Sequence, residues 1–252
     1  MIKKLKIPVI RFFLLALILI GNINTTIVSS NSLFFEKDRN IETPIAKYEK
    51  FLQSLEMLEI IKEIPNCIID IKYATNDNFL GFNFYNNQTK AYIRPECLEM
   101  LKKAYQILQS KKPGYSFIIY DAARSIEAQK IMWDNFDKPE YQKAYYVANP
   151  YGCGSLHNYG MALDLNIVDS LKNPLDMGTD FDYFGVLAHT YQTKECFING
   201  MLSKKQYENR ILLLDIMKEA GFIPANNEWW HYNACTIEEA VKKYKMFILS
   251  EV

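Results

Sequence analysis

The stretch from Gly154 to Asp164 constrains the fold more than any other part of the chain, because it leads ionisable side chains into a buried strand. Residues 161–168 alternate along much of their length and predict a strand of the core. Successive side chains of a strand point to opposite faces, so Asp164 lies on one face and the apolar Leu163 and Leu165 lie on the other. The apolar face then packs against the core, and Asp164 points into a cleft.

Two imidazoles and a carboxylate form a candidate metal site. His157 precedes Asp164 across a bend, where Gly160 allows the chain to turn so that both side chains converge. A distant stretch, residues 227–231, supplies His231; the chain has 3 histidines, and two of them fall in these stretches. Catalytic zinc takes three such protein ligands and leaves a fourth position open for water. The sequence therefore predicts one zinc ion per chain, bound by His157, Asp164 and His231.

Glu228 and Arg124 are the candidate catalytic residues. Zinc lowers the pKa of a bound water to about 7, and Glu228 would take its proton and pass it to a leaving amine. Residues 228–232 are predicted as a strand, in which Glu228 and His231 point to opposite sides, so a local bend is required. Arg124, after the predicted strand at residues 115–120, would stabilise the negative charge of a tetrahedral intermediate.

The ordinary interpretations of these residues are structural. Arg124 taken alone is an ion-pair partner of Asp121 or a helix-start residue, and the remaining histidine, His189, is assigned a structural role. The HExxH signature is absent, which excludes the helical metalloproteases. The catalytic interpretation therefore depends on the residues forming a set.

Composition and the N-terminus set the class of protein. The chain has 252 residues, 49% of them hydrophobic, with a formal net charge of +0, which excludes a disordered chain and gives no sign of a nucleic-acid partner. Residues 1–30 combine a basic start with the apolar run Phe12–Ile20 and predict a signal peptide, with an uncleaved anchor as the alternative and the only expected membrane contact. Residues 31–252 are predicted to be a single zinc peptidase domain, exported to the periplasm or cell envelope.

The remaining helices and strands follow from local signals. Helices are predicted at residues 44–61, from Pro95 to the break at residues 112–114, from Ser125 through Trp133, from the Ser203 capping box to Ala220, and after Thr236. A further strand is predicted at residues 68–73, a flap over a cleft at residues 134–153, and an excursion without periodicity at residues 169–200. An exported chain could pair some of its cysteines, with one left over in a monomer; they are Cys67, Cys97, Cys153, Cys196 and Cys235.

These motifs together resemble the VanX-type zinc D-alanyl-D-alanine dipeptidases. The resemblance rests on SxHxxGxAxD at Ser155–Asp164 and on Glu228-Trp229-Trp230-His231. Three further stretches support it: Tyr73-Ala74-Thr75-Asn76-Asp77-Asn78-Phe79-Leu80-Gly81, Tyr120-Asp121-Ala122-Ala123-Arg124 and Met177-Gly178-Thr179-Asp180-Phe181-Asp182. The family's usual Arg-Pro is Arg124-Ser125 here, and Ser125 is a sound helix N-cap.

The resemblance implies a fold and a set of roles. The fold would be α+β, with a small, mostly antiparallel sheet flanked by helices, as in zinc D-Ala-D-Ala peptidases and hedgehog-like folds. The zinc ligands and Glu228 would act as described, and Arg124 would polarise the scissile carbonyl. Ser155 and Asp182 match positions that hold the substrate ammonium, and Tyr73 matches a pocket residue.

The expected activity is zinc-dependent hydrolysis of the dipeptide D-Ala-D-Ala to two D-alanines in cell-wall peptide turnover. The alternative enzyme is a D,D- or L,D-carboxypeptidase that acts on longer peptidoglycan peptides. A third hypothesis, from a different class, is a non-catalytic wall-binding module with a vestigial site. Retention of the three ligands together with Glu228 and Arg124 argues against the third.

Overall fold

The computed structural model describes residues 44–85 and 88–251. The predicted signal peptide at residues 1–30 lies outside them. Within the described part of the chain, no helix has both the length and the apolar character that crossing a membrane requires.

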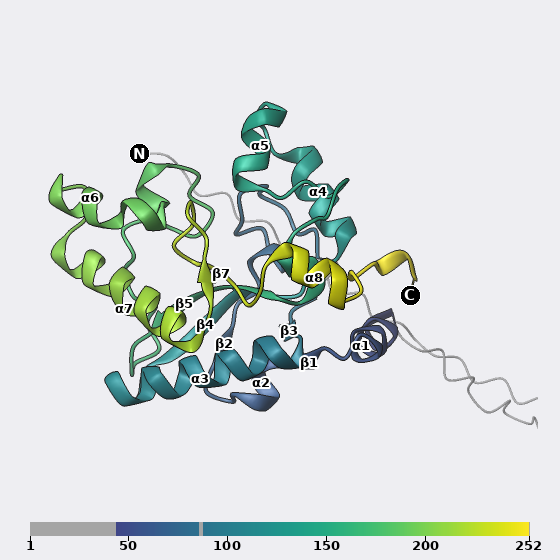
Figure 1. Cartoon of the computed structure of the whole chain (residues 1–252), viewed down its shortest axis with the longest axis horizontal. Helices are drawn as coiled ribbons and strands as arrows, with labels where there is room; N and C mark the ends of the chain where they lie inside the picture. The colour runs from purple at the N-terminus through teal and green to yellow at the C-terminus, as the bar shows by residue number, and fades with distance from the viewer. Residues whose placement is uncertain (1–43, 86–87, 252) are drawn as a thin grey trace, which may run out of the picture. The chain divides into compact units, whose positions relative to one another are not determined.

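Helices and strands alternate along the chain (Figure 1). The α-helices are α1 (Pro44–Ser54), α2 (Ile60–Glu63), α3 (Pro95–Lys111), α4 (Ile126–Asn135), α5 (Glu140–Tyr146), α6 (Thr193–Ile198), α7 (Lys204–Ala220) and α8 (Ile237–Lys243). The strands are β1 (Leu58–Glu59), β2 (Ile68–Ile69), β3 (Tyr92–Ile93), β4 (Ser116–Asp121), β5 (Ala162–Val168), β6 (Ile223–Pro224) and β7 (His231–Asn233). Short 3₁₀ helices are η1 (Lys72–Ala74), η2 (Leu156–Tyr159), η3 (Val186–Ala188), η4 (Thr190–Gln192) and η5 (Leu249–Glu251).

The central sheet has the order β2-β4-β5-β7-β6. β2 pairs with β4 in parallel, and the other pairs are antiparallel. The predicted α+β class with a small, mostly antiparallel sheet is therefore confirmed. Every residue of β4 and β5 is buried, so the face that carries Asp164 is covered as well as the apolar face. Protein lies on both sides of the strand, and the Asp164 side chain is only 2% exposed.

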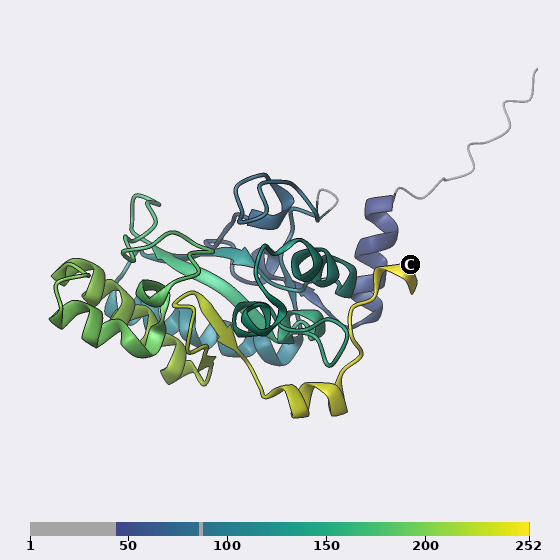
Figure 2. The same ribbon diagram turned by 90° about the horizontal axis from the view of Figure 1, so that it is seen from above.

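Helices cover both sides of this sheet. α3 packs against α7 and β4 on one side, and α4 and α5 lie on the other side (Figures 1 and 2). Local signals set the ends of α7: the Ser203 side chain accepts a hydrogen bond from Gln206 N, and Gly221 closes the helix at φ +110°. A left-handed residue at this position is most easily a glycine.

Three predicted elements differ from the observed ones. The helix predicted over residues 44–61 ends at Ser54, and a short strand and α2 follow. The strand predicted at residues 68–73 is only β2, after which η1 turns Tyr73 inward. Residues 228–230 form a turn, and the strand begins at His231. Tertiary contacts account for the first and third departures, since Ile60 N donates to Ala91 O and Trp229 N donates to Ala188 O.

The predicted flap at residues 134–153 contains α5, and the excursion at residues 169–200 contains η3, η4 and α6. All five cysteines carry free thiols in the structure. Cys153 is exposed, whereas Cys67, Cys97 and Cys196 are buried.

Candidate active site

One rung of the sheet carries three of the site's side chains. Asp121 of β4 is directly opposite Asp164 of β5, and Asp164 is directly opposite His231 of β7. Directly paired residues project to the same face with their Cβ atoms roughly 4.5–5.5 Å apart. The register of three strands therefore brings Asp164 and His231 together, although they lie far apart in sequence.

His157 reaches the same point from η2. Ser155 caps this short helix, with its hydroxyl accepting from His157 N at 3.3 Å. Gly160 ends the helix at φ +69°, and its N–H donates to His157 O. A side chain at Gly160 would be strained by this φ and would meet the Met57 side chain at 3.1 Å. The predicted role of Gly160, to turn the chain from His157 into the strand of Asp164, is confirmed.

The two imidazoles face each other through one ring nitrogen each, with His157 Nε2 3.1 Å from His231 Nδ1. On the outer sides of the rings, His157 Nδ1 lies 2.7 Å from Ala122 O, and His231 Nε2 lies 2.8 Å from Asn233 Oδ1. Both oxygens are acceptors, so each of these two contacts favours a proton on the outer nitrogen of a neutral ring and a lone pair on the inner one.

A carboxylate oxygen completes this convergence of lone pairs. Asp164 Oδ1 lies 3.0 Å from His231 Nδ1 and 3.4 Å from His157 Nε2. Burial alone would raise the pKa of Asp164, but the neighbouring His157 and His231 hold it below its ordinary value. The three ligand atoms lie within 4.8 Å of one another. Two imidazole nitrogens and a carboxylate oxygen this close together can hold a divalent cation, and this donor set suits zinc.

Glu228 lies beside this cluster because the backbone turns before β7. His231 N donates to Glu228 O at 3.4 Å, which closes the turn. Thr190 Oγ1 also donates to Glu228 O, at 3.0 Å. In a regular strand Glu228 and His231 would point to opposite sides. The turn brings them to the same side, and Glu228 Oε2 lies 3.9 Å from His231 Nδ1. Burial raises the pKa of Glu228 to about 8; His231 lowers it, and the nearby Asp164 adds to the rise.

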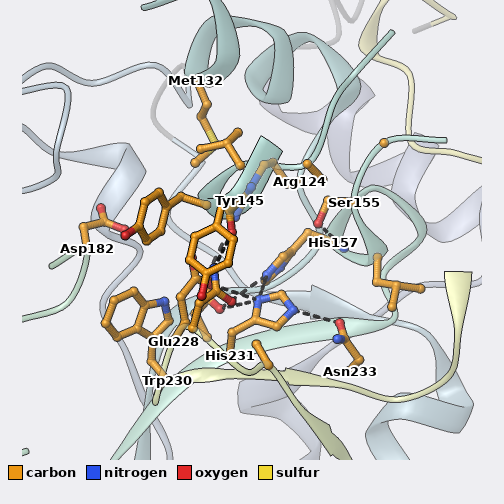
Figure 3. Close-up of a pocket in the computed structure, with 18 of the residues that line it drawn as sticks. Arg124, Met132, Tyr145, Ser155, His157, Asp182, Glu228, Trp230, His231 and Asn233 are labelled. Carbon is orange, nitrogen blue, oxygen red and sulfur yellow. Dashed lines mark hydrogen bonds and ion pairs between the residues drawn. The ribbon is translucent and has the colours of Figure 1, made fainter. Parts of the chain in front are cut away.

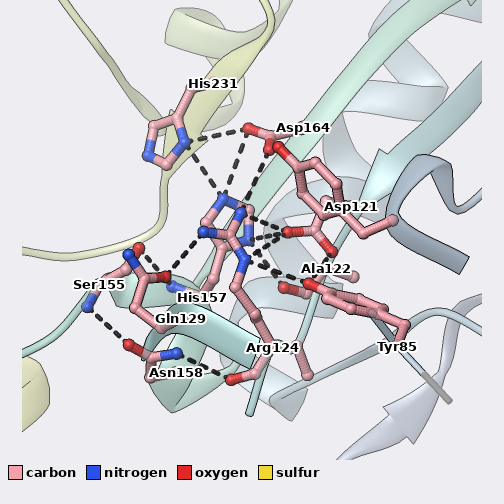
Figure 4. Close-up of polar contacts among 12 residues, drawn as sticks. Tyr85, Asp121, Ala122, Arg124, Gln129, Ser155, His157, Asn158, Asp164 and His231 are labelled. Carbon is pink, nitrogen blue, oxygen red and sulfur yellow. Dashed lines mark hydrogen bonds and ion pairs between the residues drawn. The ribbon is translucent and has the colours of Figure 1, made fainter. Parts of the chain in front are cut away.

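Arg124 is held by a buried polar network (Figure 4). Its Nε donates to Asp121 Oδ2 at 2.9 Å and to Tyr85 Oη at 3.1 Å, and its Nη1 donates to Gln129 Oε1 at 2.7 Å. The ordinary expectation of an ion pair with Asp121 is thus met. Nη2 also donates to Asp121 Oδ2, at 2.5 Å, and lies 3.8 Å from Asp164 Oδ2, and Arg124 lines the pocket. A fixed guanidinium of this kind can receive negative charge on a substrate oxygen.

Asp182 lies at one end of the pocket. Tyr73 Oη donates to Asp182 Oδ1 at 3.0 Å, and Phe79 N lies 3.4 Å from Oδ2. Burial raises the pKa of Asp182 to about 8, against the lowering effect of the Tyr73 hydrogen bond. The Asp182 backbone is left-handed, with φ +61°. An aspartate in this conformation is uncommon and is retained where the surroundings demand it.

A pocket of about 330 Å³ contains all the predicted site residues. Tyr73, Arg124, Ser155, His157, Asp164, Asp182, Glu228 and His231 all line it. Figure 3 shows Asp182 and Ser155 on opposite sides of the pocket, with Glu228 and His231 between them. Residues 144–148, from the predicted flap, also line the pocket.

Sequence reasoning missed the residues that hold the site together. They are Tyr85, Gln129, Thr190 and Asn233. Gln129 joins two parts of the site, because it accepts from Arg124 and donates to Ala148 O at 2.8 Å. Asn233 follows His231 by one strand repeat, and that spacing was the only local signal in the sequence for any of the four.

The sheet and η2 together present two imidazoles and an aspartate beside a half-buried glutamate, an arrangement that fits a hydrolase of the peptidase class. The chain belongs to the Peptidase_M15 family, D-ala-D-ala dipeptidase, whose profile matches residues 53–248. The family predicted from the sequence motifs is therefore confirmed.

Named relatives agree with this membership. A D-alanyl-D-alanine dipeptidase of Escherichia coli (strain K12) is 32% identical over 177 residues, covering 70% of this chain and 83% of the relative. A D-alanyl-D-alanine dipeptidase of Enterococcus faecium is 29% identical, covering 65% of this chain and 83% of the relative. Among solved structures, the vancomycin-resistance D,D-pentapeptidase VanY in complex with Zn(II) is 20% identical with a TM-score of 0.37, covering 65% of this chain and 85% of that one.

Proposed function

We propose that this peptidase is a zinc-dependent dipeptidase that hydrolyses free D-Ala-D-Ala to two D-alanines. The observation that carries the proposal is the content of one pocket, in which the His157, Asp164 and His231 cluster and Glu228 lie beside Asp182. The names of the relatives favour the same substrate.

The chain's own residues divide the work of peptide hydrolysis. When bound by His157, Asp164 and His231, zinc would supply a Lewis acid for the scissile carbonyl and for the attacking water. Glu228 takes the proton of that water and returns it to the leaving amine nitrogen. A carboxyl group beside the ligand cluster, with Oε2 3.9 Å from His231 Nδ1, is placed to do both. Arg124 donates to the carbonyl oxygen as negative charge develops there.

The ends of the pocket suit the ends of a free dipeptide. Asp182, supported by Tyr73, would receive the substrate ammonium, because a charge-assisted hydrogen bond in a buried site is strong. The resemblance implied that Ser155 also holds the ammonium, but Figure 3 shows Ser155 on the opposite side of the pocket from Asp182, so we reassign it to the carboxyl-terminal half of the substrate. A cavity of about 330 Å³ is at the lower end of the range for small-molecule sites, about 300–1,000 Å³.

We also propose that the enzyme is exported and acts on dipeptide released during cell-wall turnover. The basic start and apolar run of residues 1–30 support export. Fractionation of cells that express the full chain tests this, and activity confined to the cytoplasm would contradict it.

Substrate length is tested with three purified peptides: D-Ala-D-Ala, N-acetyl-D-Ala-D-Ala and a pentapeptide that ends in D-Ala-D-Ala. We expect hydrolysis of the free dipeptide only, because the other two lack an ammonium at the position of Asp182. Cleavage of the pentapeptide at a comparable rate would replace the proposal with the carboxypeptidase alternative. No cleavage of any peptide by zinc-loaded protein would favour the non-catalytic module.

The metal requirement is tested by chelation. Removal of metal should abolish turnover, and one equivalent of zinc per chain should restore it. Full activity in metal-free protein would overturn the mechanism while leaving the choice of substrate open.

A further inference from the structure

His231 has a hydrogen-bond acceptor on each side of its ring. Nε2 lies 2.8 Å from Asn233 Oδ1, and Nδ1 lies 3.0 Å from Asp164 Oδ1. A neutral imidazole has one N–H, so it can donate to only one of these oxygens at a time. The two contacts therefore favour opposite tautomers of the same ring.

We propose that Asn233 is a positioning residue that selects the Nε2–H tautomer of His231 and keeps the Nδ1 lone pair open for a divalent cation. The inference rests on the metal-binding role proposed above for His231. It concerns a side chain that the family motifs used in the sequence analysis do not include.

The sheet fixes Asn233 in the position that this role requires. His231 and Asn233 are alternate residues of β7, so their side chains project to the same face. In the ladder with β5, His231 is opposite Asp164 and Asn233 is opposite Ala162. β6 pairs with the other edge of β7, where Ile223 is opposite Asn233. Because β7 is paired along both edges, its backbone holds the Asn233 amide beside the His231 ring (Figure 3).

Without Asn233, the competing tautomer would block the site. Its Nδ1–H would donate to the Asp164 carboxylate at 3.0 Å, a charge-assisted hydrogen bond of the stronger kind. That bond would occupy one ligand nitrogen and one ligand oxygen together. A cation could then bind only after the bond broke and the proton moved to Nε2.

A main-chain acceptor, rather than a side chain, favours the corresponding tautomer of His157. Its Nδ1 lies 2.7 Å from the main-chain oxygen of Ala122, an acceptor that no substitution removes. The tautomer of His231 depends instead on the side chain of Asn233, so a substitution at that position can change it. Removal of a residue that hydrogen-bonds to a metal ligand typically lowers metal affinity by about 10–100-fold.

The first experiment measures zinc affinity by competition with a chromophoric chelator. Asn233→Leu, which removes the acceptor, should weaken zinc binding by about 10–100-fold. Asn233→Asp, which retains an acceptor oxygen, should bind zinc as tightly as the wild type. Asn227→Leu is the matched control, because Asn227 lines the same pocket and donates to Tyr145 O, without a contact to a ligand; its affinity should not change.

The second experiment observes the tautomer directly in metal-free protein. Long-range ¹H–¹⁵N spectra at about pH 8, where imidazoles are neutral, should show three patterns, because the chain has 3 histidines. His231 should be the Nε2–H form in the wild type and the Nδ1–H form in Asn233→Leu. Thermal unfolding of each variant in chelator checks that the fold is retained.

Wild-type zinc affinity in Asn233→Leu, or an unchanged tautomer, would overturn the proposal. Weak binding in Asn233→Asp equal to that in Asn233→Leu would also overturn it, since a loss of packing would then explain both. Neither experiment uses a peptide. Failure to hydrolyse D-Ala-D-Ala would therefore remove the proposed function and leave these results to decide the role of Asn233.

Discussion

The sheet and the loops contribute different parts of the site, and they hold those parts by different means. Asp164 and His231 lie on one rung of β5 and β7, so the main-chain ladder determines their separation. Glu228 and Asp182 lie outside the strands and are held by two hydrogen bonds each. Glu228 O accepts from Thr190 Oγ1 and His231 N, and the Asp182 carboxylate accepts from Tyr73 Oη and Phe79 N.

The sheet therefore holds two of the predicted metal ligands, and the loops hold the predicted catalytic base and the predicted contact to the substrate ammonium. A strand register cannot shift by one residue without turning every side chain to the other face, so the ligand cluster is tolerant of change elsewhere. A loop side chain held by one or two bonds can be lost or moved with the sheet intact. Loss of a loop residue should therefore alter turnover or substrate affinity and leave metal content unchanged.

The largest effect is expected at the ligand cluster. His157→Ala removes one of three ligands and should abolish zinc retention after dialysis together with all measurable turnover. The loss of zinc affinity should exceed the loss of about 10–100-fold that follows removal of a residue hydrogen-bonded to a ligand. Metal analysis and hydrolysis of D-Ala-D-Ala measure the two losses, and zinc retained at one per chain would show that His157 is not a ligand.

Glu228→Gln should remove the catalytic base in the loop and leave zinc binding unchanged. Loss of a general base lowers kcat by about 10²–10⁴-fold, while zinc content should equal that of the wild type. Steady-state kinetics with parallel metal analysis test both halves of this statement. Unchanged turnover would reject Glu228 as the base, and lost zinc would show that the two regions are not independent.

Asp182→Asn should act on substrate affinity. Hydrogen bonds to charged groups contribute about 1.5–3 kcal/mol, so KM for D-Ala-D-Ala should rise about 10–150-fold with a smaller change in kcat. Kinetics over a wide range of substrate concentration separate the two constants. An unchanged KM would place the ammonium elsewhere.

Metal-free protein should become less stable as pH rises through neutrality. The pKa of Asp182 is about 8 in the fold, against 3.8 for an ordinary aspartate. Between these values the folded state holds a proton that the unfolded state has released, so the free energy of unfolding falls with increasing pH. Urea unfolding across this range should show a shallower decline in Asp182→Asn, with Glu228 still contributing; identical slopes would contradict the assignment.

The smallest effect tests how the loop is held. Thr190→Val removes the hydroxyl that donates to Glu228 O, and a bond of about 0.5–1.5 kcal/mol corresponds to about a 2–10-fold loss in kcat. Thr193→Val is the matched control, since its hydroxyl donates to His189 O on the same segment. Equal kcat losses in the two variants would indicate general loosening of the segment.

Local patterns predicted the elements whose causes are local. The Ser125 side chain accepts from Ala128 N at the start of α4, as a residue in that position should. The convergence of His157, Asp164 and His231 was predictable because few histidines are present and the Gly160 bend lies between His157 and Asp164. The turn at residues 228–230 was predicted as a strand, because it depends on the contacts of Trp229 and Glu228 with Ala188 and Thr190. Tyr85 likewise meets Asp121 across a long sequence separation, and no local pattern encodes such a contact.

The left-handed backbone of Asp182, at φ +61°, has a consequence for attempts to engineer this chain. Glycine adopts that conformation without strain, so Asp182→Gly would relieve the backbone at this position. The same variant would lose the hydrogen bonds to Tyr73 Oη and Phe79 N and the carboxylate that is proposed to select the substrate. A library selected for heat resistance should therefore be tested for hydrolysis of D-Ala-D-Ala as well as for melting temperature.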